Sequence, residues 1–202
     1  IELSFDTICA FKDHGAMMHY KATEESNAKV EGNGFLLVDS GGHYLEGTTD
    51  ITRTFAIGKV NDQAKTAFTN VLKSHIALAE AVFPSGITHK ELDTISRMPL
   101  WKTYQDYRHG TGHGVGYLLS VHEGPQSMRQ RWCPAPLQEN MTLTIEPGVY
   151  LEGKFGVRTE NTMLVKRDDY SDGEKKWLCF EPLTLCPIDL APVDMEMLEQ
   201  YE

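Results

Sequence analysis

The chain has 202 residues, of which 41% are hydrophobic, and a formal net charge of −10 at pH 7. This length and hydrophobic content are enough for one substantial domain with a buried core. The acidic balance argues against a nucleic-acid or anionic-membrane partner, because such partners are bound through clustered Lys and Arg. No apolar run approaches the roughly eighteen residues that a membrane span needs, so the sequence predicts no membrane insertion.

The first residues read as the interior of a longer protein. The chain opens at Ile1 within a strand-like phrase, "IELSFDTICAF", and has no initiator methionine. We expect residues 1–202 to form a single domain that is truncated at its N-terminus, with upstream domains absent. The lack of a targeting signal at such a start carries little weight.

The first half of the chain predicts β structure followed by helices. Residues 34–58 combine an apolar run with a later alternation of β-branched residues, which is typical of strands. Apolar residues then recur at helical spacing from about residue 61 to residue 82. Thr88 and Glu91 form a capping box, which predicts that a second helix begins there.

The second half predicts further strands. Residues 141–150, 155–165 and 176–185 are apolar phrases that end at Gly, Pro or Asp. Residues 191–202 are expected to begin a final helix. Together these elements predict an α+β domain, with sheet-rich segments at both ends and helices between them.

The phrase "RHGTGHGVG" carries two histidines, His109 and His113, at a spacing that would put both on one face of a helix. Glycines interleave with them at positions 110, 112, 114 and 116, and each glycine weakens a helix by roughly 1 kcal/mol relative to alanine. The pattern therefore disfavours a helical zinc motif and favours irregular or extended backbone.

Carboxylates end or interrupt otherwise apolar strand phrases at four places: Asp39, Asp50, Glu146 and Glu160. Each one alone is ordinarily a turn or solvated residue. Such carboxylates are costly to bury unless a cation meets them, and four in one chain favour a shared site. If they converge with His113 they repel one another, unless divalent cations neutralise them, and two such ions would balance four carboxylates.

Four phrases resemble the catalytic domain of aminopeptidase P, the Xaa-Pro aminopeptidases among the pita-bread metallopeptidases: "LLVDSGGHYLEGTTDITRT", "YRHGTGHGVGYLLSVHEGPQ", "LTIEPGVY" and "GVRTENTMLV". They occur in the family's order and spacing, and the match runs from about Phe5 to the C-terminus. The resemblance implies the α+β pita-bread fold, a pseudo-two-fold arrangement of a curved antiparallel sheet flanked by helices. It also implies that the N-terminal part of this fold is missing and that residues 1–202 belong to one catalytic metallopeptidase domain.

The resemblance implies a pair of metal ions and assigns their ligands. Asp39 would bind one metal, His113 and Glu146 the other, and Asp50 and Glu160 would bridge both. These oxygen-rich ligands without a thiolate suit Mn²⁺, which the resemblance also implies, while Co²⁺, Fe²⁺ or Zn²⁺ remain alternatives. The glycines would let the backbone pass close to the metal pair.

Further positions match active-site residues of the family. They are His19, His109, His122, Tyr150 and Arg158, which the resemblance places on the substrate side or behind the metal ligands. We predict that His122, with His109 or His19 nearby, hydrogen-bonds the developing oxyanion and positions the peptide. A metal pair lowers the pKa of a water between the ions, and Glu146 would carry the proton to the leaving proline nitrogen. The expected partner is a peptide with a penultimate proline, and a homodimer is compatible with the resemblance.

Three alternatives stay open. Prolidase shares the fold and the metal ligands, although His122 nine residues after His113 looks more like the aminopeptidase P pattern. Methionine aminopeptidase is similar in fold but fits the phrases less well. A non-catalytic pita-bread binding module is the reading from another class, and such modules usually lose metal ligands.

Other polar residues have simpler interpretations. The sequence favours two interpretations of Arg53 equally: it braces a carboxylate behind the metal ligands, or it lies on the surface. The other histidines are expected to be exposed or to act as local caps: His14, His43, His75 and His89.

Four cysteines lie far apart without C-x-x-C spacing: Cys9, Cys133, Cys179 and Cys186. This favours reduced, mostly buried thiols in a cytoplasmic protein. A disulfide between Cys179 and Cys186 is the alternative.

Overall fold

The computed structural model describes residues 2–131, 135–170 and 173–201. The strands are β1 (Glu2–Leu3), β2 (Ile8–Phe11), β3 (Gly34–Ser40), β4 (Gly42–His43), β5 (Ile51–Ile57), β6 (Phe83–Pro84), β7 (Gly112–His113), β8 (Ser127–Met128), β9 (Thr142–Ile145), β10 (Gly148–Leu151), β11 (Phe155–Arg158), β12 (Asn161–Arg167) and β13 (Trp177–Pro182). The helices are α1 (Asp62–Ala79) and α2 (His89–Trp101), with 3₁₀ turns η1 (Lys12–Ala16) and η2 (Met195–Met197).

The predicted β segment at 34–58 forms the hairpin β3–β5, joined by β2 into a three-stranded antiparallel sheet. In β3, Phe35 and Leu37 are buried and alternate with less buried residues, as expected for a sheet with one face on the core. The register pairs Asp39 with Thr52, so the polar end of β3 lies beside the start of β5.

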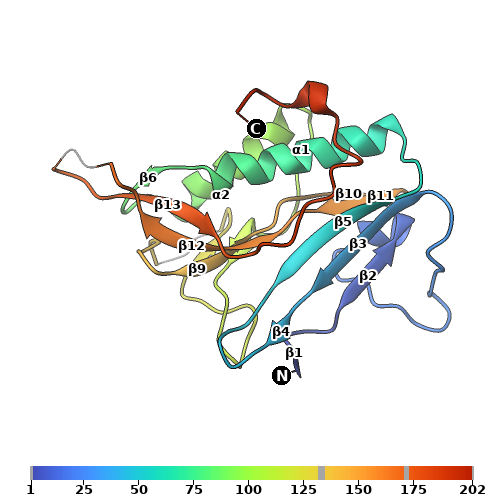
Figure 1. Ribbon diagram of the computed structural model, residues 1–202, viewed down its shortest axis with the longest axis horizontal. Coiled ribbons are helices and arrows are strands. Elements are labelled where there is room, and N and C mark those ends of the chain that lie inside the picture. The colour runs from blue at the N-terminus through green and yellow to red at the C-terminus, as the bar shows by residue number, and fades with distance from the viewer. Residues whose placement is uncertain (1, 132–134, 171–172, 202) are drawn as a thin grey trace.

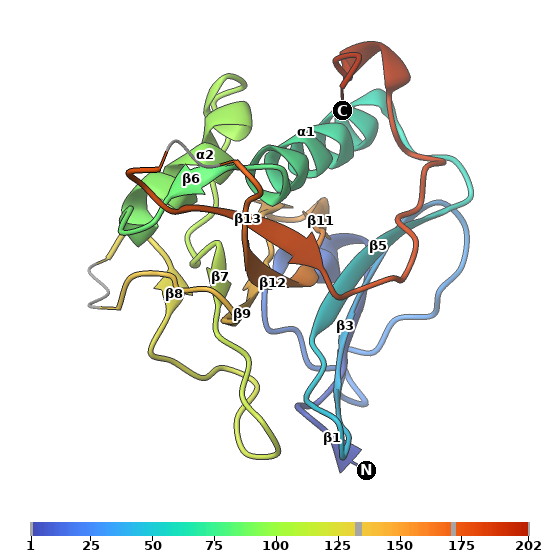
Figure 2. The same cartoon turned by 60° about the vertical axis from the view of Figure 1, so that its left-hand side comes forward.

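The two helices pack against each other at the end of the molecule that also holds the C-terminus (Figure 1). Asn61 caps α1 by accepting a hydrogen bond from the Ala64 amide, and the predicted Thr88–Glu91 capping box is present at α2. The first helix ends at Ala79, three residues before the expected end at 82. Figure 2 shows β1 and the N-terminus at the opposite end.

The C-terminal strands differ from the expectation in a way that bears on function. The segment 141–150 divides into β9 and β10, and the break contains Glu146. Likewise 155–165 divides into β11 and β12, and that break contains Glu160. Strands β6, β13, β12 and β9 form an antiparallel sheet in that order, while β10 and β11 form a separate hairpin. Both glutamates therefore lie where the chain leaves one sheet for another.

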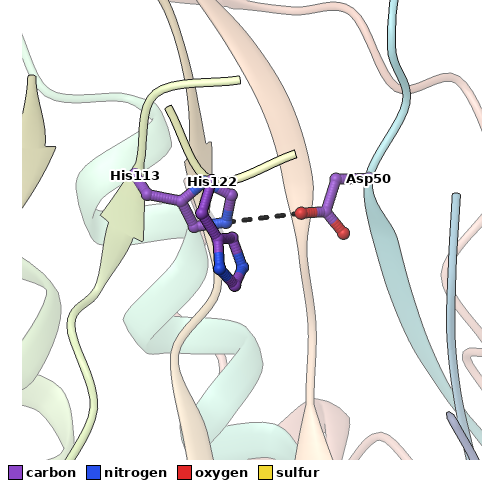
Figure 3. Close-up of side chains that lie close together, drawn as sticks. All are labelled: Asp50, His113 and His122. Carbon is purple, nitrogen blue, oxygen red and sulfur yellow. Dashed lines mark ion pairs between the residues drawn. The ribbon is translucent and has the colours of Figure 1, made fainter. Parts of the chain in front are cut away.

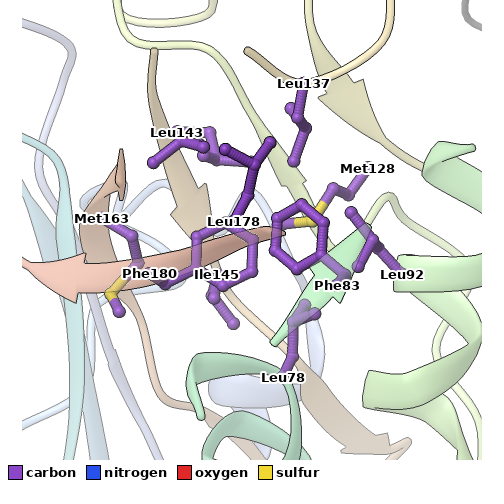
Figure 4. Packing of buried hydrophobic residues seen from close by; sticks show 11 residues of the cluster. Leu78, Phe83, Leu92, Met128, Leu137, Leu143, Ile145, Met163, Leu178 and Phe180 are labelled. Carbon is purple, nitrogen blue, oxygen red and sulfur yellow. The ribbon is translucent and has the colours of Figure 1, made fainter. Parts of the chain in front are cut away.

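A hydrophobic core packs the four-stranded sheet against the helices (Figure 4). Its buried members are Leu78, Phe83, Leu92, Met128, Leu137, Leu143, Ile145, Met163, Val165, Leu178 and Phe180. These side chains come from both helices and from strands far apart in sequence, so the core fixes α2 relative to β9 and β12.

Several expectations about single segments are wrong. Within the described part of 191–202, the expected final helix is limited to the short turn η2. Met195 and Tyr201 are exposed, so they provide little apolar burial to stabilise a longer helix. Three histidines are buried rather than exposed: His43, His75 and His89. Their surroundings in the tertiary structure, not their local sequence, bury them.

The cysteine prediction is correct in one respect and wrong in another. Cys9, Cys179 and Cys186 are free thiols, so the alternative disulfide does not form. Cys9 and Cys186 are exposed rather than buried, and Cys9 faces outward because it alternates with buried Ile8 and Ala10 along β2. Cys133 lies outside the described residues.

Among the described residues, neither helix combines the length and the apolar character needed to cross a membrane.

Candidate metal centre

The five side chains expected to bind metal converge on one site. Asp39 lies in β3, Asp50 precedes β5, His113 lies in β7, and Glu146 and Glu160 lie between strands. Three overlapping groups bring their ligand atoms within 4.8 Å of one another: Asp39, Asp50 and Glu160; His113, Glu146 and Glu160; and Asp50, His113 and His122. Figure 3 shows the last group, with the imidazole of His113 directed at Asp50. Residues at or next to the ends of strands from several sheets therefore supply the site.

His113 faces two carboxylates through one ring nitrogen. Its Nε2 lies 3.3 Å from Asp50 Oδ2 and 3.4 Å from Glu146 Oε1. Its Nδ1 lies 2.8 Å from the Gly114 carbonyl oxygen and donates to it, which fixes the ring. Burial lowers the pKa of His113, but the hydrogen bond with Asp50 and the charge of Glu146 outweigh burial and raise it. The Nε2 atom is thus positioned to share either a proton or a cation with the carboxylates.

The carboxylates crowd one another in a site of low solvent access. Burial raises the pKa of Glu146 to about 7, even though His113 opposes the shift. Burial, with the charges of Glu146 and Asp50, raises the pKa of Glu160 well above its ordinary value. Burial also raises the pKa of Asp39, against the charge of Arg158. Divalent cations would relieve this repulsion and reverse these shifts.

Arg158 is the arginine that contacts the acidic cluster directly. Its Nη2 donates to Asp39 Oδ2 at 2.6 Å, its Nη1 donates to the Tyr150 hydroxyl at 2.8 Å, and its Nε donates to Thr52 Oγ1 at 3.0 Å. The other Asp39 oxygen, Oδ1, is buried and has no hydrogen-bond partner among the described residues. An unpaired buried carboxylate oxygen next to three other carboxylates fits a metal ligand.

His109 uses both ring nitrogens within the protein. Nδ1 donates to the Gly110 carbonyl at 2.7 Å, and Nε2 lies 2.9 Å from the Tyr150 hydroxyl. Burial lowers the pKa of His109 to about 4, so the ring is neutral near pH 7 and Nε2 accepts from Tyr150. His109 and Arg158 therefore hold Tyr150 between them.

A cavity of about 630 Å³ opens beside the cluster. Among the residues predicted for the site, it is lined by His19, Asp39, Asp50, His109, His113, His122, Glu146, Arg158 and Glu160. Tyr150 is not on its wall and lies behind His109. His19 and His122 are exposed. The His122 and His113 rings are in an edge-to-face arrangement, with 4.1 Å between the ring centroids. These two histidines have ring nitrogens accessible from the cavity side.

The glycines around His113 lie where neighbouring backbone segments pack closely. A Cβ on Gly112 would lie 1.8 Å from the Thr144 carbonyl oxygen, and one on Gly114 would lie 2.0 Å from that of Glu123. The absent side chains therefore let neighbouring backbone segments touch, which places His113 against β9. Gly110 and Gly112 also line the cavity.

Sequence reasoning missed two threonines that hold the carboxylates. Thr52 Oγ1 donates to Glu160 Oε2 at 2.7 Å. Thr144 Oγ1 donates to Glu146 Oε1 at 3.3 Å and accepts from the His113 amide at 3.2 Å. The period-two alternation that puts Thr52 on the same side as Asp50 was the available signal.

Arg53 lies behind the carboxylates rather than on the surface. It is buried, and its Nη1 donates to the Glu160 carbonyl oxygen at 2.6 Å. It also donates to Asn161 Oδ1 and to the Cys186 and Pro187 carbonyls. Of the two interpretations of Arg53, the bracing one is correct, although the contact is with the backbone of Glu160.

Comparison with known proteins identifies the family of the chain. The sequence profile of metallopeptidase family M24 matches residues 1–167. The chain is 46% identical to aminopeptidase P1 of Lotus japonicus, over 99% of this chain and 31% of that protein. It is also 46% identical to a probable Xaa-Pro aminopeptidase P of Laccaria bicolor, over 99% of this chain and 32% of that protein. The chain thus spans about a third of the length of these relatives.

Solved structures agree. An X-prolyl aminopeptidase of Caenorhabditis elegans, described as a cytosolic enzyme with a di-nuclear active site, has a TM-score of 0.94 and 44% identity, covering 99% of this chain and 33% of that one. A prolidase of Pyrococcus furiosus has a TM-score of 0.77 and 33% identity, covering 92% of this chain and 50% of that one. These similarities confirm the predicted pita-bread fold. The chain belongs to metallopeptidase family M24.

Proposed function

We propose that the protein containing this chain is an Xaa-Pro aminopeptidase, which hydrolyses the bond between an N-terminal residue and a penultimate proline with the help of two divalent metal ions. The observation that carries the proposal is the convergence of four carboxylates and one imidazole at a cavity. The relatives named above, among them the C. elegans enzyme with its di-nuclear site, support the substrate class.

The chain's own residues fit a pair of hard cations. Asp39 would bind one ion, His113 and Glu146 the other, and Asp50 and Glu160 would bridge. The Asp39 Oδ1 atom, which has no hydrogen-bond partner among the described residues, and the raised pKa values of Glu146 and Glu160 support this assignment, since a divalent cation would satisfy the first and reverse the other two. Oxygen-rich ligands without thiolate favour Mn²⁺.

The bound metals would polarise the scissile carbonyl and make a water acidic enough to act near neutral pH. Around them, each residue has a separate task. His122 and His19, exposed at the cavity, hydrogen-bond the carbonyl oxygen of the peptide and stabilise the charge that develops on it. His109 is engaged on both nitrogens, so it orients Tyr150, which in turn contacts Arg158 on the cavity wall.

Glu146 is the proposed proton carrier. Its carboxyl lies among the proposed metal ligands and on the cavity wall. A ligand carboxylate in that place would reach a water held by the metals, so it can accept a proton from that water and deliver it to the leaving proline nitrogen.

We also infer a cytoplasmic location. The free thiols of Cys9, Cys179 and Cys186 support it, because disulfides form in the oxidising environment outside the cell, whereas thiols stay reduced in the cytoplasm. The C. elegans relative is described as cytosolic.

The test combines metal content and turnover in the full-length protein. Metal is stripped with a chelator and Mn²⁺ is added back, and the protein is assayed with an Xaa-Pro-Yaa tripeptide, an Xaa-Pro dipeptide and an Xaa-Ala-Yaa control. We expect two metals per chain and Mn²⁺-dependent release of Xaa from the proline tripeptide. Asp50→Asn should lower the metal content, whereas Asp62→Asn in the first turn of α1 should not.

The other outcomes identify the rival functions. Cleavage of the dipeptide alone would assign the protein to the prolidases. A folded full-length protein with neither metal nor turnover would reject the enzyme and favour a binding module.

A further inference from the structure

Helix α2 carries a buried ion pair that the proposed metal chemistry does not use. Asp93 and Arg97 stand four residues apart, and their side chains are 1% and 2% exposed. Arg97 donates from Nε to Asp93 Oδ2 at 2.7 Å and from Nη2 to Asp93 Oδ1 at 3.1 Å. Burying two charges is expensive unless the remaining donors and acceptors find partners, so the other contacts of the guanidinium are informative.

The remaining donors of Arg97 reach the segment that precedes β7. Nη1 donates to Asp106 Oδ1 at 2.8 Å and to the Tyr107 carbonyl at 2.6 Å. Nη2 donates to the His109 carbonyl at 2.8 Å. The guanidinium also lies 3.9 Å from the centroid of the Tyr107 ring. The five N–H groups of a guanidinium are thus divided between Asp93 and this segment.

Asp93 holds the next residues of the same segment. Its Oδ1 accepts a hydrogen bond from Thr111 Oγ1 at 2.6 Å, and the Thr111 hydroxyl also contacts the Tyr107 hydroxyl. Residues 106–111 are therefore bound to a single turn of α2 by side-chain and backbone contacts. We call Asp93 and Arg97 the α2 clamp.

His109 is one of the two residues whose backbone carbonyl accepts a hydrogen bond from the clamp, Tyr107 being the other. Its ring accepts from Tyr150, the Tyr150 hydroxyl accepts from Arg158, and Arg158 donates to Asp39. A continuous series of polar contacts thus runs from α2 to a proposed metal ligand. A shift of the His109 backbone would move the first member of this series.

We propose that Asp93 and Arg97 are positioning residues for the peptidase reaction, which act by fixing His109 at the substrate side of the cavity. The inference rests on the proposed function, because it takes from that proposal the task of His109, which is to orient Tyr150. A misplacement of about 1 Å at a positioned group can lower a rate on the order of a hundredfold.

The first experiment removes both charges of the clamp in the full-length protein. A single substitution would leave one buried charge without its partner. The double variant Asp93→Asn with Arg97→Met removes both charges of the clamp and avoids this. Leu92→Ala is the matched control, because Leu92 is fully buried on the same helix and belongs to the hydrophobic core rather than to the clamp. All proteins are assayed below their melting temperatures. Should the double variant not fold, Arg97→Lys replaces it, since lysine keeps the charge but lacks the donors for both carbonyls.

We expect the clamp variant to lose at least tenfold in kcat, with less than threefold change in KM for the tripeptide and in Mn²⁺ affinity. Leu92→Ala should keep kcat within twofold. In a His109→Gln background the clamp substitution should cost less than a further twofold, because the clamp acts through His109. An equal tenfold loss in that background, or no loss in the wild-type background, overturns the proposal.

A second readout does not depend on turnover. Long-range ¹H–¹⁵N spectra report the ring nitrogens of each histidine, and His109→Gln assigns the His109 signals. The clamp variant should shift the His109 signals and leave those of His75 in place, since the His75 ring contacts Asn161 elsewhere. Unchanged His109 signals overturn the clamp even if the protein is an aminopeptidase. Shifted signals in a protein that cleaves no peptide keep the α2 clamp as a structural device and reject the proposed function.

Discussion

Arg158 of β11 and Asp39 of β3, 119 positions apart in sequence, form a largely buried ion pair, with Nη2 2.6 Å from Oδ2. The pair joins the hairpin β10–β11 to the three-stranded sheet. It also sets a fixed cation against a cluster of carboxylates that otherwise repel one another. The stability of the metal-free protein therefore depends on Arg158.

Replacing Arg158 with Met should destabilise the metal-free protein by about 3 kcal/mol, because Asp39 is left buried without its partner. Mn²⁺ should offset much of this loss, since it supplies the missing positive charge and binds only the folded state. Thermal melting with and without Mn²⁺ measures the effect. The Tm increase on adding Mn²⁺ should be larger in the variant than in the wild type, and Arg167→Met, at an exposed position of β12, should match the wild type. Equal increases in all three proteins would contradict the prediction.

Replacing Thr52 with Val should weaken metal binding by about tenfold to a hundredfold, because second-layer hydrogen bonds orient metal ligands. Thr52 holds Glu160 at 2.7 Å and accepts from Arg158 at 3.0 Å. Titration calorimetry with Mn²⁺ measures the affinity. Thr69→Val is the matched control, since Thr69 is equally buried but lies in α1 and bonds to the Lys65 carbonyl. An affinity loss of the same size in both variants would show that Thr52 has no special role.

Replacing Gly112 with Ala should cost about 3 kcal/mol of folding stability, because the new methyl would overlap the Thr144 carbonyl oxygen and force β7 away from β9. Chemical denaturation gives the free energy of unfolding. Gly47→Ala serves as the control, since a Cβ there meets no atom within 4 Å. A Gly112 variant as stable as the control would mean that the two strands separate without strain.

Stability should fall in mild acid through His75. Burial, with a smaller effect of Arg53, lowers the pKa of His75 to about 4 from an ordinary value of 6.5. The unfolded chain therefore binds the proton more readily than the folded protein does. His75 costs no folding stability above pH 6.5, and the free energy of unfolding falls as the pH drops from 6.5 toward 4, by at most about 3 kcal/mol. Urea unfolding at pH 7 and pH 4.5 should show a smaller difference for His75→Gln than for the wild type. His19→Gln, at an exposed position, should follow the wild type, and parallel behaviour of all three proteins would contradict the assignment.

The elements that the sequence predicted best are those decided by neighbours a few residues apart. The Thr88–Glu91 box starts α2 because both hydrogen bonds lie within one turn. The strands β3 and β5 were also predicted from neighbouring residues, through the alternation of side chains in 34–58. The glycines around His113 correctly excluded a helix, although contacts with neighbouring backbone explain them.

The convergence of the site could not be derived from spacing. Asp39 and Glu160 meet because β3 pairs with β5 and the Glu160 amide donates to the Thr52 carbonyl, and the second contact joins segments far apart in sequence. The burial of His43 and His75 likewise depends on the tertiary surroundings that local patterns do not contain. The resemblance to a family, not the composition, supplied the set of five ligands.

The placement of Glu160 at the junction of β11 and β12 has a consequence for biosynthesis. The two residues proposed to bridge the metals, Asp50 and Glu160, come from distant parts of the sequence, and the Asp50 carbonyl accepts from Thr162, across 112 residues. Contacts that span so much sequence form late, after the loops between them have closed. A nascent chain that has emerged only as far as α2 holds two of the five proposed ligands, Asp39 and Asp50. Under the proposed assignment, tight metal binding requires the segment that carries Glu160 to have been synthesised, so the ion would stabilise the folded domain rather than initiate its folding.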